Sequence, residues 1–102
     1  MHARVLHFHI RSGQLKEFQS AVDSVVPQIR KQAGFRALVV LHASQGAKPE
    51  ATVMSVWDSL DDLKASEKNM FLYQALARVL TYCEGFPAIR EHEVLVSEFA
   101  AD

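Results

Sequence analysis

The stretch FRALVVLHA at residues 35–43 decides the fold of this 102-residue chain. β-Branched and aliphatic side chains occupy both alternating sets of positions, a pattern typical of a strand that is covered on both faces. The loop-type residues SQGAKPE (44–50) connect it to a second such run, ATVMSVWD (51–58). The two runs therefore predict a β-hairpin inside a sheet that needs a cover on each side.

The residues before this hairpin predict a strand followed by a helix. RVLHFHI (4–10) alternates as a strand does, with bulky side chains on both faces. From Gln14 to Ala33 the apolar residues recur at helical spacing, with charged residues elsewhere around the helix. Pro27 lies inside this pattern and predicts a kink, and Gly34 is a suitable end for the helix.

The residues after the hairpin predict a second helix and a last strand. Ser59 followed by Asp62 has the form of a capping box, and a helix over 59–83 follows, with looser apolar phasing around residues 67–69. Gly and Pro in EGFP end this helix, and IREHEVLVSEF (89–99) predicts a strand near a sheet edge. The order is β-α-β-β-α-β. It predicts one α+β domain over 1–102, ferredoxin-like, with a four-stranded antiparallel sheet, its first and third strands central, and two helices on one face.

The face of this sheet away from the helices is also apolar. Val39, Leu41, Val56 and Leu95 have nothing left in a monomer to cover them. An exposed apolar patch of this size is typical of an interaction surface. We therefore expect a homodimer in which two sheets pack face to face.

Composition excludes several classes of partner. The formal net charge is −1 with acids and bases interspersed, so neither nucleic acid nor an anionic membrane surface is an expected partner. The longest aliphatic run, Ala37 to Leu41, is far shorter than the roughly 20 residues that span a bilayer. Cys83 is the only cysteine and no signal-peptide pattern is visible, which together favour a cytoplasmic protein.

Nearly the whole chain resembles the antibiotic biosynthesis monooxygenase domain of the dimeric α/β-barrel group. The likeness rests on the element order, on Gly13, on PQIRKQAGFRALVVLHAS (27–44) and on VMSVWDSLDDLKA (53–65). It implies a dimeric barrel with substrate between sheet and helices. It also implies a monooxygenase that needs no metal or flavin, because an electron-rich aromatic, quinol-like or polyketide-type compound reduces O2 itself.

Two residues match positions implicated in polyketide-oxidising members of that family, Trp57 and His42. Trp57 offers an indole N–H and a flat face for an aromatic ligand, and His42 can accept a phenolic proton. The alternatives are a core tryptophan and a histidine bonded to solvent or backbone. The expected substrate contacts are Leu6, Phe8, Leu38, Val40, Ser55, Asn69, Phe71 and Tyr73.

Departures from the family pattern keep a second function open. Val53, Leu63 and Ala77 stand where polyketide-oxidising relatives carry polar residues. Leu6, Ser66 and Leu76 stand where haem-degrading relatives need asparagine, tryptophan and histidine, so haem degradation is not expected. The absence of helix histidines also disfavours an isomerase or lyase. A protein that holds a small apolar ligand without turnover, as a binding or stress-response protein, is the alternative to the oxygenase.

A His-x-His pair lies on the first strand. By strand alternation His7 and His9 point away from the predicted cleft, toward the expected dimer seam, with His92 on a neighbouring strand. The sequence shows no carboxylate or cysteine that completes a ligand set, so we expect no bound metal. Hydrogen-bonded histidines in the dimer interface are the expectation here.

Overall fold

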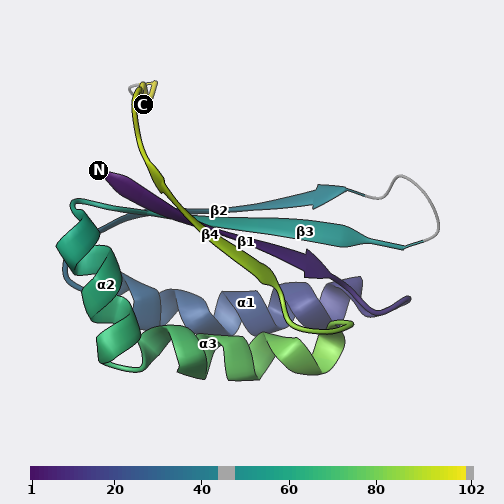
Figure 1. The fold of residues 1–102 in the computed structure, drawn as a ribbon. Helices are drawn as coiled ribbons and strands as arrows, with labels where there is room; N and C mark the ends of the chain where they lie inside the picture. Colours follow the sequence, from purple (N-terminus) through teal and green to yellow (C-terminus); the bar gives the residue numbers. More distant parts are fainter. Residues whose placement is uncertain (44–47, 101–102) are drawn as a thin grey trace.

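The computed structural model describes residues 1–43 and 48–100, so part of the predicted hairpin loop, residues 44–47, lies outside the described chain. The elements are β1 (His2–His9), α1 (Leu15–Arg30), β2 (Phe35–Ala43), β3 (Glu50–Trp57), α2 (Leu60–Lys68), α3 (Phe71–Val79), the 3-10 turn η1 (Leu80–Tyr82) and β4 (Ala88–Glu93). The strands form one antiparallel sheet in the order β2-β3-β1-β4. Figure 1 shows all three α-helices against one face of this sheet, which confirms the ferredoxin-like α+β fold and its central first and third strands.

Strand alternation divides β1 between the two faces of the sheet. Arg4, Leu6 and Phe8 are buried under the helices, whereas His7 and His9 lie on the opposite face. Register with β3 pairs Arg4 with Ser55 and Leu6 with Val53 across the helix-covered face. The two central strands therefore supply the floor of any cavity beneath the helices.

The core under the helices consists of two apolar clusters. One contains Leu6, Phe8, Phe18 and the buried side of α3, with the Phe8 and Phe18 rings packed edge to face at 5.3 Å. The other gathers Val25, Ile29, Trp57, Leu63 and Phe71. Members of both clusters line one cavity under the helices.

The predicted second helix is two helices in the structure. Met70 adopts a left-handed backbone conformation with φ 69° between α2 and α3, at the C-terminal edge of the loosely phased residues. Asn69 stabilises the new start, because its Oδ1 accepts a hydrogen bond of 3.0 Å from the Phe71 N–H. The cap predicted at Ser59 is confirmed, since its Oγ accepts a 3.1 Å bond from the Asp62 N–H.

Other boundaries also differ from expectation. α1 ends at Arg30, before the expected end at Ala33, and Pro27 lies within it. β4 stops at Glu93 rather than continuing to residue 99. Figure 1 shows the chain after β4 rising on the side of the sheet opposite the helices. Within the described residues, no helix combines the length and apolarity needed to cross a membrane.

The prediction that Val56 is left uncovered is wrong, because this side chain is only 6% exposed. Its cross-strand neighbour Ala3 is buried as well. The segment after Glu93 leaves the sheet at this end of β3, since Glu93 pairs with His2 and His2 with Trp57. Val39 and Leu41 on β2 remain exposed as expected.

Candidate functional site

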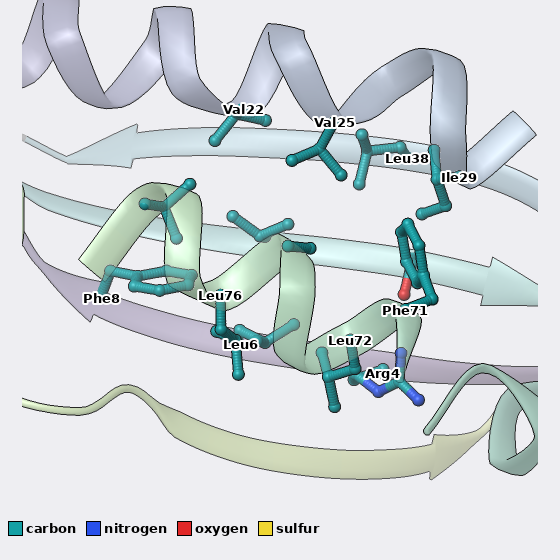
Figure 2. A pocket seen from close by; sticks show the side chains of 14 residues that line it. Arg4, Leu6, Phe8, Val22, Val25, Ile29, Leu38, Phe71, Leu72 and Leu76 are labelled. Carbon is teal, nitrogen blue, oxygen red and sulfur yellow. The ribbon is translucent and has the colours of Figure 1, made fainter. Parts of the chain in front are cut away.

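A cavity of about 70 Å³ lies between the sheet and the helices α1 and α3. Figure 2 shows Val22, Val25 and Ile29 on the α1 side, with Leu72 and Leu76 on α3. An engineered apolar cavity of ~150 Å³ takes a benzene-sized guest. The cavity as it stands is therefore about half the size that a single ring requires, and ring binding needs side-chain or helix movement.

Most of the wall residues that the sequence predicts do come together in this cavity. Leu6 and Phe8 of β1, Leu38 of β2, Ser55 of β3 and Phe71 of α3 all line it. The strand residues come together because strand alternation places each of them on the helix-covered face. Phe71 joins them as the first residue of α3, the helix that packs on that face.

Asn69 and Tyr73 lie elsewhere. Asn69 is exposed, and besides capping α3 its Nδ2 donates a 2.8 Å hydrogen bond to Gln32 Oε1. Tyr73 is exposed on the outer side of α3. Neither side chain is among the residues that line the cavity.

Trp57 is fully buried behind the cavity wall rather than in it. Its indole packs edge to face on Phe35, with ring centroids 5.8 Å apart, and belongs to the cluster of Val25 and Ile29. Its Nε1–H donates a 3.0 Å hydrogen bond to Ser55 Oγ. Ser55 does line the cavity, so Trp57 is connected to the cavity wall only through its hydrogen bond to the serine hydroxyl.

His42 lies at the opposite end of the same strand pair. It pairs with Ala51, six residues before Trp57 on β3, which corresponds to about 20 Å along a strand. His42 and Val40 line a second, wider hollow of about 310 Å³ between β2 and α1. The two spaces share Val22, but the two residues predicted to act together do not meet.

Arg4 is the functional candidate that the sequence analysis missed. Its side chain is 1% exposed and lines the cavity, next to Phe71 and Leu72 in Figure 2. The signal was present in the sequence. Arg4 is in phase with Leu6 and Phe8, so strand alternation alone places a charged residue on the buried face.

The guanidinium group of Arg4 is held from one side only. Its Nη2 lies 2.9 Å from both the Leu63 carbonyl oxygen and Ser66 Oγ, and 3.3 Å from Glu67 Oε1. Its Nε is buried without a hydrogen-bond partner among the described residues. Burial lowers the pKa of Arg4, while the nearby Glu67 carboxylate opposes that shift. A buried cation with an unused donor is costly unless another group satisfies it.

Two polar residues, Arg4 and Ser55, are among the described residues that line the cavity. Ser55 lies directly across from Arg4 in the β1–β3 register, and the other described lining side chains are apolar. The polar atoms of the two residues are covered, so the surface that faces the empty space is apolar. No His, Cys, Asp or Glu side chain is among the described lining residues, so the cavity offers no usual ligand for a metal or a haem iron, and a resident group of that kind does not fit. The arrangement suits an apolar molecule.

Comparison with known proteins places this geometry in a family. The family model described as "Antibiotic biosynthesis monooxygenase" matches residues 1–78. No curated protein matches the chain.

Solved structures share the fold. A substituted form of SnoaB, a cofactor-independent oxygenase from Streptomyces nogalater, has a TM-score of 0.77 at 12% identity, over 94% of each chain. The haem-degrader MhuD from Mycobacterium tuberculosis, with two haems bound in its active site, has a TM-score of 0.76 at 18% identity, over 97% of this chain and all of the other. A protein of unknown function from Nitrosomonas europaea has a TM-score of 0.74 at 17% identity, over 99% of this chain and 95% of the other. Because the family model covers most of its length, the chain belongs to the antibiotic biosynthesis monooxygenase family.

Proposed function

We propose that this protein is a cofactor-independent monooxygenase that oxidises a small aromatic, quinol-like or polyketide-type compound with O2. Family membership supports an oxygenase, and the apolar cavity with Arg4 and Ser55 in its lining supports this substrate class. For a ring with an activated CH2 group, the balanced reaction is CH2 + O2 → C=O + H2O. The substrate supplies all four electrons, so the protein need only bind, orient and ionise it.

The placement of Arg4 and Ser55 side by side in the cavity lining is the observation that carries this proposal. Removing a proton from the substrate leaves negative charge on a ring oxygen, and fixed donors in a dry site stabilise such charge strongly. Arg4 supplies a positive charge and a buried Nε donor that has no partner among the described residues. Ser55 Oγ accepts from Trp57, and its hydroxyl hydrogen can donate to the substrate oxygen. Both donors are covered in the present structure, so the movement that widens the cavity must also uncover them.

Trp57 is accordingly a positioning residue in this mechanism, because it acts through Ser55. His42 keeps its proposed role in proton transfer for a substrate that extends past Val22 into the wider hollow between β2 and α1. Entry of a ring requires the cavity to widen. The α2–α3 junction at Met70 is the proposed point of movement, since Phe71 and Leu72 follow it directly and line the cavity.

A second function, ligand binding without turnover, is favoured by one specific feature. Apart from Arg4 and Ser55, the described lining offers no side chain that can move a proton. A general base normally lies within hydrogen-bond reach of the proton that it removes. A carrier or stress-response protein would need no such base.

Oxygen uptake separates the two functions. Purified protein is mixed with a panel of hydroquinones and anthrones, and consumption of O2 is compared with that in buffer alone. The oxygenase predicts faster uptake for wild type, a large loss for Arg4→Met and Ser55→Ala, and no loss for Lys16→Gln at an exposed site on α1. Uptake at the buffer rate throughout contradicts the oxygenase for these compounds. Saturable binding without uptake then supports the carrier.

We also propose a homodimer through the open face of the sheet, giving the dimeric α/β barrel. That face exposes Val39 and Leu41, and the tail after β4 exposes Leu95 and Phe99, which are 86% and 72% accessible. Large exposed apolar side chains of this kind are typical of an interface. The buried lone thiol of Cys83 suits the cytoplasmic location that we propose for the assembly.

A further inference from the structure

The open face of the sheet carries a cluster of metal-binding side chains that is separate from the cavity. His7 and His9 project from β1 on the side away from the helices, and His9 pairs with Glu50 on β3. One ligand atom from each of the three residues lies within 4.8 Å of the other two. Glu50 is the carboxylate that the sequence did not reveal, because only the strand register places it beside the His-x-His pair.

Each histidine lies close to one oxygen of the Glu50 carboxylate. His9 Nδ1 lies 3.3 Å from Glu50 Oε1, and His7 Nε2 lies 3.6 Å from Glu50 Oε2. Zinc binds nitrogen and oxygen at about 2.1 Å, so neighbouring ligand atoms of a tetrahedron lie roughly 3.4 Å apart. The two histidine–glutamate distances are near that value, and the ligand atoms of His7 and His9 lie within 4.8 Å of each other, so side-chain movement can bring all three onto one ion.

The surroundings also suit an ion. His7 Nδ1 is 3.3 Å from Thr52 Oγ1, a contact that orients the ring and leaves Nε2 facing Glu50. The residues paired on either side, Ala88 with His7 and Ala43 with Glu50, are small. In the single chain the three ligand side chains are 40% to 53% exposed, so an ion has access to them from solvent. In the proposed dimer the partner sheet would cover this face, and a group from the partner could then take the place of water.

We propose that His7, His9 and Glu50 form a binding site for a divalent transition-metal ion of the zinc class. Two imidazoles and one carboxylate suit Zn²⁺, Ni²⁺ or Co²⁺ rather than Mg²⁺ or Ca²⁺, which prefer oxygen ligands. The protein supplies three ligands, and water or a group from a second molecule completes the shell. The site faces away from the cavity, so it does not depend on the proposed oxygenase function.

Calorimetric titration of the tag-free, chelator-treated protein with Zn²⁺ tests the site, and the visible spectrum of bound Co²⁺ reports its ligands. Wild type is expected to bind one ion per chain, and Mg²⁺ is not expected to compete. Thr52→Val removes only the contact that orients the His7 ring, so it should weaken Zn²⁺ affinity by roughly 10- to 100-fold. His9→Ala and Glu50→Gln each remove a ligand, so each should weaken Zn²⁺ affinity by more than that.

His92→Ala is the matched control. His92 lies on the same face but pairs with Ala3, outside the cluster, so this variant should bind as wild type does. Circular dichroism checks that each variant is folded. Absence of saturable Zn²⁺ binding by wild type overturns the proposal, and so does equal affinity of wild type and His9→Ala. In either case the cluster is a contact between histidine and glutamate side chains only.

Discussion

The indole Nε1 of Trp57 lies 3.0 Å from Oγ of Ser55, two residues earlier on the same face of β3, and donates a hydrogen bond to it. This bond connects a fully buried core residue to the wall of the cavity. Arg4 stands across the strand from Ser55, and its guanidinium carbon lies 5.8 Å from the centroid of the Trp57 ring. The three side chains form one polar unit inside an apolar core.

Ser55→Ala should destabilise the protein because it leaves a buried indole N–H without an acceptor. The expected loss is about 1–3 kcal/mol in the free energy of unfolding, the cost of an unsatisfied buried donor. Urea denaturation of Ser55→Ala measures it. In a Trp57→Phe background the donor is gone, so the same serine substitution should cost clearly less. An equal cost in both backgrounds would show that the bond contributes nothing.

Arg4→Met should remove recognition of anionic ligands while leaving the fold intact. Methionine fills similar space, and the Glu67 side chain that pairs with Arg4 is 26% exposed, so its carboxylate stays in contact with water when the arginine is removed. A hydrogen bond to a charged group contributes about 1.5–3 kcal/mol, so affinity for an aromatic carboxylate such as naphthoate should fall roughly 10- to 100-fold. Calorimetry with naphthoate and with neutral naphthalenemethanol separates charge from shape. A similar loss for both ligands contradicts a specific role for the charge.

Gly34→Ala should cost more stability than Gly13→Ala, although the two glycines have nearly the same backbone conformation, with φ of 77° and 78°. Either alanine pays about 1–2 kcal/mol for a left-handed conformation. At Gly34 a new Cβ would also overlap the side chain of Asp62 at the start of α2, whereas nothing lies within 4 Å at Gly13. Thermal and urea unfolding of the two variants measure the difference. Equal losses would mean that Asp62 moves aside freely.

Local patterns in the sequence predict most of the fold, because each strand and helix has its own period. Leu6 and Phe8 were placed correctly in the cavity since alternation alone fixes their face. The same rule does not show that His42 lines a different space from Leu6 and Phe8. His42 and Phe18 line the wider hollow, whereas Phe8 lines the cavity. The contact between Phe8 and Phe18 depends on packing between elements, which strand alternation does not predict.

Other features depend on geometry that no local pattern carries. The left-handed Met70 is neither glycine nor asparagine, so residue type gives no warning of the helix break. Glu50 meets His9 only through the register of β1 with β3. The direction of the Trp57 indole depends on its hydrogen bond to Ser55 rather than on strand parity.

The ion pair between Lys64 on α2 and Glu91 on β4 should make stability depend on pH. Lys64 Nζ lies 2.9 Å from Glu91 Oε1, and this hydrogen bond lowers the pKa of Glu91 below its usual value and raises that of Lys64. A lowered folded-state pKa means that the unfolded chain binds the proton more readily, so the contribution of Glu91 is complete above about pH 4.5 and is lost as the pH falls further.

A double-mutant cycle measures this dependence. Lys64→Met, Glu91→Gln and the double variant, each unfolded in urea at pH 7 and at pH 3, give the coupling energy of the pair. We expect favourable coupling at pH 7, small because both side chains are partly exposed, and weaker coupling at pH 3. Coupling of equal size at the two pH values would assign the interaction to packing rather than to charge.

Leu41→Glu should convert the proposed dimer to a monomer without unfolding it. Leu41 is 57% exposed on β2, on the face away from the helices, so a charge there costs the free chain little. In a dimer the same carboxylate would be desolvated against the partner sheet, which carries a penalty of several kcal/mol. Sedimentation equilibrium should therefore report a dimer for wild type and a monomer for Leu41→Glu. Leu60→Glu, at an exposed position on α2, should remain dimeric. A monomeric wild type at micromolar concentration contradicts the dimeric barrel directly, because Val39, Leu41 and Phe99 would then stay in water.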